Sequence, residues 1–253
     1  MISQDTFYTL LYIWSGLAVA TFMLLLFVTA PYGRHTTNKW GPTLPNRWGW
    51  FIMEIPVLAV FAWFFFTGDR EQSAPDYIIF GLFAIHYIRR IFIYPFQMHE
   101  NGKRMPLVIV FMAIFFNIAN GYFNGYWFGY IGNTYDSSYI TGWQFITGII
   151  LFFIGFTLNV ISDQTLLNLR KGGKKGYRIP YGGLFENISS PNLLGEIIEW
   201  AGWALMAWCM PAFSFALWTA ANLIPRSLDH HRWYHRKFKD YPKNRKALIP
   251  YLL

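Results

Sequence analysis

The chain has 253 residues, of which 54% are hydrophobic and 21% aromatic, whereas only 13% are charged. This composition is too apolar and too poor in charge for a soluble domain of this length, so a lipid bilayer is the expected solvent. The net charge of +8 does not indicate a nucleic-acid partner, because the basic residues lie between apolar runs and at the C-terminal end. The single cysteine, Cys209, excludes an intrachain disulfide.

Apolar runs recur along the whole chain. Five of them are close to the ~20 residues that a helix needs to cross the hydrocarbon core: residues 8–30, 48–67, 77–96, 106–130 and 143–163. A sixth stretch, 193–224, is too long for one crossing and contains Pro211 near its middle. We expect it to form two helices joined by a tight turn, and a single tilted helix kinked at Pro211 is the alternative.

The distribution of Lys and Arg supports this arrangement. With the N-terminus outside and seven crossings, 18 of the 21 basic residues fall in the cytosolic segments, while Arg70 alone lies in an outer segment. The sequence therefore predicts an all-α integral membrane protein, a single membrane-embedded domain over residues 1–253. It would form a seven-transmembrane helix bundle with the N-terminus outside and the C-terminus cytosolic. The host membrane would be the endoplasmic reticulum of a eukaryote or the inner membrane of a bacterium.

Ionisable side chains inside such spans are costly, and each one indicates a functional site. Glu54 lies about 9 Å and Tyr87 about 14 Å from the inner ends of their spans, at 1.5 Å per residue, so the two could meet at similar depth. The alternative for Glu54 is a structural ion pair with Arg89 or Arg90. Interhelical hydrogen bonding is the expected role of three asparagines in the fourth run, Asn117, Asn120 and Asn124.

Two further polar pairs lie near the cytosolic ends of spans. Asn159 and Asp163 are four residues apart and share a helix face, and Glu196 and Glu199 are three apart at the start of the sixth span. The two glutamates could instead only interact with the dipole at a helix N-terminus. The basic loop 170–178 could bind a ligand or only contact anionic lipid. Together these residues predict a polar cavity that opens to the cytosol.

The C-terminal histidines raise the question of a metal site. His231 and His235 are four residues apart, but the many Arg and Lys neighbours would oppose a divalent cation, so we expect no metal. The same positive field suits a multiply phosphorylated anion. The sequence contains neither a G-x-G-x-x-G nor a G-x-x-x-x-G-K-[ST] pattern, so a nucleotide would have to bind between helices and cytosolic loops.

Several motifs resemble those of the steroid 5α-reductase family. They are NVISD at 159–163, LRK at 169–171, YRIPYGGLF at 177–185, NLLGEIIEW at 192–200, HHRWY at 230–234 and YPKNRKALIP at 241–250. The resemblance covers essentially the whole chain and is weaker in the first hundred residues, where Glu54 and the His86–Tyr87 pair still match. The sequence differs from the family pattern at Asp229, where relatives can have histidine, and in the stretch 172–175.

The resemblance implies seven transmembrane helices, NADPH as hydride donor, and reduction of the 4,5 double bond of 3-oxo-Δ4 steroids. Glu54 and Tyr87 would be catalytic and face the substrate carbonyl, with Glu54 either donating as a neutral acid or orienting the tyrosine as a carboxylate. Trp50 and Phe51 would supply an apolar wall for the substrate. The resemblance assigns cofactor binding to Asn159, Asp163, Arg170, Tyr177, Arg178, Asn192, Glu196, Arg226, His230 and Tyr234.

Other functions stay open at this point. The substrate could be another lipid enone or an enoyl thioester, as in the enzymes of very-long-chain acyl or polyprenol synthesis. A membrane methyltransferase of the prenylcysteine type would also place a nucleotide-like cofactor beside a lipid, and a lipid carrier would need no cofactor. Membrane lipid is an expected contact in every case, and nothing in the sequence requires a protein partner.

Overall fold

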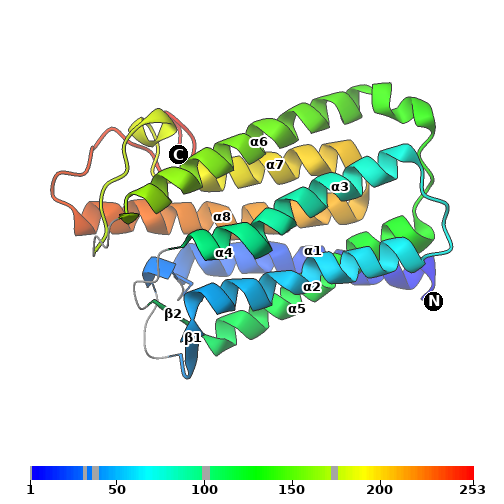
Figure 1. Cartoon of the computed structure of the whole chain (residues 1–253), viewed down its shortest axis with the longest axis horizontal. Helices are drawn as coiled ribbons and strands as arrows, with labels where there is room; N and C mark the ends of the chain where they lie inside the picture. The colour runs from blue at the N-terminus through cyan, green and yellow to red at the C-terminus, as the bar shows by residue number, and fades with distance from the viewer. Residues whose placement is uncertain (1, 31–32, 36–39, 99–102, 172–175) are drawn as a thin grey trace.

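A computed structural model describes residues 2–30, 33–35, 40–98, 103–171 and 176–253. Within these residues the chain forms α-helices that run along one common axis (Figure 1). The helices are α1 (Gln4–Phe27), α2 (Asn46–Thr67), α3 (Ala74–Ile88), α4 (Tyr94–Gln97), α5 (Leu107–Tyr126), α6 (Trp143–Asn168), α7 (Pro191–Ala207) and α8 (Met210–Lys237).

Five helical segments of the described chain are long and apolar enough to cross a membrane, as expected for a multi-pass membrane protein. They are Gln4–Phe27, Asn46–Thr67, Ala74–Gln97, Leu107–Ile131 and Trp143–Asn168. Each coincides with one of the five predicted apolar runs. Their outward faces carry large apolar side chains, for example Trp63 and Phe115, which are each 66% exposed. Such faces are stable in contact with lipid and not with water.

The sixth apolar stretch forms two helices, as predicted. Helix α7 ends at Ala207, and Trp208 adopts a left-handed conformation (φ 45°) that reverses the chain into α8. Pro211 lies in the first turn of α8 and not at the break. Its missing N–H costs little there, because the first N–H groups of a helix have no partner within the helix. Neither helix is among the five apolar candidates, so seven crossings remain a prediction.

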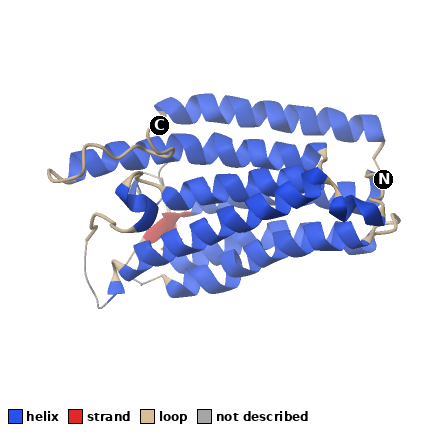
Figure 2. Ribbon diagram, turned by 90° about the horizontal axis from the view of Figure 1, so that it is seen from above, coloured by secondary structure: helices blue, strands red, loops and turns tan. Residues whose placement is uncertain are grey.

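The connections gather at the two ends of the bundle. The N-terminus lies at one end, and the C-terminal segment and the α6–α7 connection lie toward the other (Figures 1 and 2). At this second end the short antiparallel strands β1 (Thr43–Pro45) and β2 (Arg104–Pro106) join the α1–α2 and α4–α5 connections. These connections, the α6–α7 loop, the first turn of α2, the last turns of α8 and the C-terminal segment carry the predicted cytosolic charges. Lys39, Lys174 and Lys175, which belong to that set, lie outside the described residues.

A buried ion pair stabilises the opposite end. Arg70 Nη2 donates to Asp76 Oδ1 at 2.8 Å, and the exposed fractions of the two side chains are 5% and 0%. The same guanidinium group donates to the carbonyls of Phe128, Gly132 and Asn133. Arg70 therefore joins the start of α3 to the chain after α5, and its hydrogen bonds compensate its burial.

Glycines allow α6 and α7 to pack closely. A Cβ at Gly155 would lie 2.2 Å from the Glu199 nitrogen, and a Cβ at Gly195 would lie 2.5 Å from the Asn159 nitrogen. Only glycine permits this backbone approach, as in other membrane helix pairs with small residues in the contact. The contact places the Asn159 and Asp163 side of α6 next to the first turns of α7, where the polar pocket begins.

Candidate functional site

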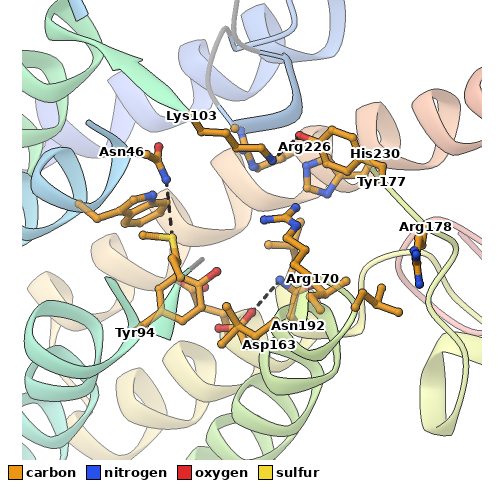
Figure 3. Close-up of a pocket in the computed structure, with 18 of the residues that line it drawn as sticks. Asn46, Tyr94, Lys103, Asp163, Arg170, Tyr177, Arg178, Asn192, Arg226 and His230 are labelled. Atoms are coloured by element: carbon orange, nitrogen blue, oxygen red, sulfur yellow. Dashed lines mark hydrogen bonds between the residues drawn. The ribbon is translucent and has the colours of Figure 1, made fainter. Parts of the chain in front are cut away.

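A polar pocket opens at the end of the bundle that holds the C-terminal segment (Figure 3). Helices α2, α6, α7 and α8, the end of the α3–α4 segment and the α6–α7 loop all contribute to its wall. The polar and aromatic side chains that line it are Asn46, Trp50, Arg90, Tyr94, Lys103, Asp163, Arg170, Tyr177, Arg178, Asn192, Glu196, Arg226, His230 and Tyr234.

The side of the pocket formed by α6 and α7 is a hydrogen-bonded amide and carboxylate network. Asn192 Nδ2 donates to Asp163 Oδ1 at 3.2 Å, and Asn159 Nδ2 donates to the Asn192 carbonyl at 3.0 Å. Arg89 donates to Asn159 Oδ1 at 3.2 Å and lies 3.5 Å from Asp163 Oδ2. Asn159 is buried behind the wall, so it positions Asn192 and does not itself line the pocket.

The α6–α7 loop and the α4–α5 connection supply a cationic side. Arg170 projects into the pocket from the end of α6, toward Tyr177 and His230 (Figure 3). The Tyr177 ring lies 5.3 Å from the Arg170 guanidinium carbon and 4.3 Å from Lys103 Nζ, which also donates to the Tyr177 hydroxyl at 2.8 Å. Arg178 lies at the edge of the pocket, apart from the other labelled side chains.

Helix α8 provides a third side through residues on one face. Arg226, His230 and Tyr234 are spaced four residues apart, so they follow one another along the helix and all line the pocket. The His230 ring stacks on His35 with a centroid separation of 5.7 Å, and its Nδ1 lies 3.5 Å from Ser190 Oγ. These contacts hold the imidazole against the start of α7.

Arg90 connects the pocket to the interior of the bundle. Its Nε lies 3.4 Å from Glu54 Oε1 and its Nη1 lies 3.6 Å from Glu196 Oε2. The guanidinium carbon also stacks over the Trp50 ring at 4.5 Å. Arg89 and Arg90 begin a π-helical turn, Arg89–Ile93, and this local widening of the helix aims one arginine at α6 and the other at α2 and α7.

Glu54 and Tyr87 lie deeper than the pocket wall. Glu54 is 8% exposed, and Asn117 Nδ2, which donates to the Met53 carbonyl at 2.6 Å, lies 3.5 Å from its second carboxyl oxygen. Tyr87 is 5% exposed and packs against Phe83 and Trp200. Burial in a low-dielectric interior makes an unpaired charge costly, so Arg90 stabilises the Glu54 carboxylate there.

Most residues predicted for cofactor binding converge. Nine of the ten line the pocket, and the tenth, Asn159, supports it from behind. Trp50 lines the pocket, whereas Phe51 packs against Phe92 and Phe96 toward the outside of the bundle. The structural ion pair that was the alternative for Glu54 is present, and its partner is Arg90.

The N-terminal dipole interpretation of the two glutamates is wrong. Helix α7 begins at Pro191, so Glu196 and Glu199 lie in its second and third turns, beyond the reach of the first free N–H groups. Glu196 instead contacts Arg90, and Glu199 lies 2.7 Å from His86 Nδ1. Four polar residues line the pocket that the sequence did not assign to a ligand site: Asn46, Arg90, Tyr94 and Lys103. The basic character of loop 97–105 was the only signal for Lys103.

The donor set determines what the pocket can hold. Lys103, Arg170, Arg178 and Arg226 present four permanent positive charges, which suit phosphate groups, and arginine can bind them in a bidentate manner. Carboxylate and amide groups on the opposite side suit hydroxyl and carboxamide groups. The fold and the site thus define a class: helical membrane proteins with a cationic pocket at one end of the bundle, next to buried acid and phenol groups.

Comparisons with known proteins identify the family within this class. The 3-oxo-5-alpha-steroid 4-dehydrogenase family model matches residues 103–253. The chain is 40% identical to steroid 5-alpha-reductase DET2 of Gossypium hirsutum, with 93% of each chain covered. It is 39% identical to 3-oxo-5-alpha-steroid 4-dehydrogenase 1 of Bos taurus, with 96% of each covered, and equally identical to the Homo sapiens protein of that name, with 96% and 94% covered. The chain belongs to the 3-oxo-5-alpha-steroid 4-dehydrogenase family, whose members are oxidoreductases acting on CH–CH groups.

Proposed function

We propose that this protein reduces the 4,5 double bond of 3-oxo-Δ4 steroids to the 5α-reduced ketone, with NADPH as the electron donor. One observation carries the proposal beyond family membership. Arg90 contacts both Glu196, which lines the cationic pocket, and Glu54, which lies deeper in the bundle. A cofactor in the pocket and a carbonyl substrate near Glu54 and Tyr87 would therefore lie next to one another.

The pocket residues fit a phosphorylated dinucleotide. Arg170, Arg226 and Lys103 would bind its phosphates, and Tyr177, which contacts two of these cations, would keep them in place. Asp163 and Asn192 would accept and donate hydrogen bonds to the uncharged polar groups. The exposed position of Arg178 suits a phosphate at the solvent side of the pocket.

The cofactor supplies a hydride for the β-carbon of the conjugated ketone. Negative charge then develops on the carbonyl oxygen, and a hydrogen bond donated there by the Tyr87 hydroxyl lowers the barrier by ~3 kcal/mol. Among the described residues this hydroxyl has no hydrogen-bond partner, so it is available to a substrate. Arg90 lies 3.4 Å from the Glu54 carboxyl, and the rings of Phe83 and Trp200 pack against the Tyr87 ring, so its surroundings are largely apolar.

The substrate class can be tested with purified protein in detergent. NADPH oxidation is followed with a 3-oxo-Δ4 steroid, an enoyl thioester and a polyprenyl enone or aldehyde, and the products are separated by chromatography and mass spectrometry. The proposal predicts turnover with the steroid and a 5α-configured product. Turnover confined to one of the other two substrates, or a 5β product, would contradict it.

The residue roles can be separated in the same assay. Tyr87→Phe should lower kcat by about 100-fold, because the hydrogen bond to the developing oxyanion is lost, while the Kd for NADPH changes little. Glu54→Gln should lower kcat by a similar factor with the same small change in Kd, because the charge that pairs with Arg90 beside the site is lost. Arg170→Ala should instead raise the Kd for NADPH by about 10-fold or more, because a phosphate contact is lost. Cofactor Kd is measured by fluorescence titration without steroid. Similar losses of cofactor affinity in all three variants would show that these roles are wrong.

A further inference from the structure

A second acid lies deep in the bundle and has no role in the reaction as described. Glu199 Oε1 lies 2.7 Å from His86 Nδ1, and the exposed fractions of the two side chains are 0% and 3%. The other carboxyl oxygen, Oε2, is buried and has no hydrogen-bond partner among the described residues. The pair joins α3 to α7 in the middle of the aromatic core that contains Phe83, Trp200 and Trp203.

This pair is the inner of two rungs between the same helices. Arg90 and His86 are four residues apart on the α3 segment, and Glu196 and Glu199 are three apart on α7. The outer rung, Arg90 with Glu196, lines the cofactor pocket, and the inner rung lies about 5 Å farther along the helices, or one helical turn. A line of polar groups therefore leads from the solvent-facing pocket into the core.

The inner rung ends at Tyr87. The His86 and Tyr87 ring centroids are 5.1 Å apart, and both rings pack against Trp200, at 4.6 Å and 5.7 Å. Among the described residues, His86 Nε2 and the Tyr87 hydroxyl have no hydrogen-bond partner, so each can bond to a water molecule or to a ligand between them. The titratable and charged groups that act on the pair are Glu54 from α2, Tyr87, Arg89 and Arg90 from the α3 segment, and Glu196 from α7.

Burial requires that this pair keep a proton. With neutral histidine and ionised glutamate, a net negative charge would remain in the apolar core beside Glu54 and Glu196. One shared proton, on the imidazole or on the carboxyl, removes that charge. The pair is thus a proton-holding site next to the reacting region, one helical turn from the outer rung that borders the pocket.

We propose that the His86–Glu199 pair stores the proton that the reduction consumes and delivers it through Tyr87, an inference that rests on the proposed function. Hydride addition to the β-carbon shifts the π electrons onto the carbonyl oxygen. This oxygen takes the Tyr87 proton, so the phenolic O–H bond breaks and an enol O–H bond forms. The phenolate takes the proton of the pair, the pair regains one from the pocket, and the enol rearranges to the ketone by moving its proton to the α-carbon.

Glu199→Gln tests this proposal, because glutamine keeps the hydrogen bond to His86 and cannot hold the proton. We expect kcat to fall by about 100-fold, in the range of lost general acid–base catalysis, with an unchanged Kd for NADPH. The solvent deuterium isotope effect on kcat should rise, because proton delivery becomes rate-limiting. Glu199→Asp should restore at least part of the activity. If the contact were purely structural, Glu199→Gln would leave the solvent isotope effect unchanged, and Glu199→Asp would not restore activity.

A double variant protects the test against misfolding. His86→Phe with Glu199→Leu removes both polar partners, a change that buried ion pairs often tolerate without loss of stability, and it should show the same loss of kcat. Asp76→Asn, in the buried Arg70–Asp76 pair at the far end of α3, is the control for removing a buried carboxylate and should leave the isotope effect unchanged. A folded Glu199→Gln or double variant with kcat within about 3-fold of the wild type would overturn the proposal.

One readout does not depend on turnover. Infrared spectra of the cofactor-free protein resolve a protonated carboxyl and an imidazolium, and the proposal predicts that one of the two bands is present at neutral pH and disappears in the double variant. Absence of both bands in the wild type would overturn it. A wild type that shows the band but reduces no steroid would instead count against the proposed function, so the two failures are distinguishable.

Discussion

His231 lies where the end of α8 meets the C-terminal segment, outside the apolar spans. Its Nδ1 is 2.6 Å from Ser189 Oγ, which in turn is 2.7 Å from the Tyr241 hydroxyl. Burial of the ring, then the nearby positive charges of His235 and Lys246, lowers the pKa of His231 below its usual value. The neutral imidazole therefore belongs to the folded arrangement, in which this triad holds the C-terminal segment against the start of α7.

The lowered pKa makes stability depend on pH. The unfolded chain binds a proton at His231 more readily than the folded chain, so the contribution is complete above the unfolded pKa of ~6.5 and is lost as the pH falls through the folded value. We expect the thermal midpoint in detergent to decrease between about pH 7.5 and about pH 5, and His231→Gln to reduce this slope. An identical slope in the wild type and the variant would exclude His231 as its source.

At the scale of elements, the α6–α7 contact determines the geometry of the site. Gly148 and Gly155 on α6 face Gly202 and Gly195 on α7, with the same seven-residue spacing on each helix. This spacing returns to one helix face after two turns, so the backbones stay close over that length. Asn159 extends the contact toward the pocket, so the register of the two helices places Asp163 beside Asn192 and Glu196.

Replacing Gly155 should separate these helices. A Cβ there would lie 2.2 Å from the Glu199 nitrogen and 2.5 Å from the Gly195 carbonyl oxygen, both backbone atoms that cannot rotate away. We expect Gly155→Ala to destabilise the protein by about 1–3 kcal/mol and to weaken NADPH binding. Gly81→Ala is the matched control, because nothing lies within 4 Å of that Cβ, and it should stabilise α3 by about 0.5–1 kcal/mol. Equal thermal midpoints and NADPH affinities for the two variants would contradict this account.

At the scale of the whole molecule, the helices and much of the pocket could be predicted from the sequence. The five long apolar runs became helices, because length and hydropathy are local properties, and the stretch around Pro211 divided into two. The pocket residues could be assigned because the motifs of the second half resemble those of a family. Trp50 lines the pocket whereas Phe51 packs against Phe92 and Phe96, since neighbouring residues on a helix point in different directions, and the contact of Phe51 with the substrate stays a prediction.

Pairings between distant helices could not be predicted. The ion pair of Glu54 with Arg90 and not Arg89 depends on the π-helical turn Arg89–Ile93. Pro95 follows this turn and has no N–H for the Ile91 carbonyl, but a proline alone does not show which of the two arginines turns toward Glu54. The contact of His86 with Glu199, 113 positions away, depends on the packing of α3 against α7. A single sequence does not show which residues of two distant helices lie opposite one another, so the sequence alone leaves several possible partners for each glutamate.

The positions of the basic residues predict which side of the membrane the pocket faces. The connection after α5 lies at the same end as the N-terminus, and the pocket and the C-terminal segment lie at the other end, which also holds most of the basic residues (Figure 1). Because basic segments remain on the cytosolic side, the pocket should face the cytosol, where reduced cofactor is supplied. This orientation requires that α7 and α8 together cross the membrane an even number of times, as they do if both span.

Single cysteines on a Cys209→Ala background can test it with a membrane-impermeant maleimide. Ser137, Lys171 and Lys243 are exposed and lie after α5, after α6 and after α8. We expect Ser137→Cys to react only from the outer face, and Lys171→Cys and Lys243→Cys only from the cytosolic face. Reaction of Lys243→Cys from the same side as Ser137→Cys would mean that α7 and α8 together make a single crossing. In that case Arg226 and His230 of α8 could not line the same pocket as Arg170 of α6, because they would lie on the opposite side of the bilayer from it.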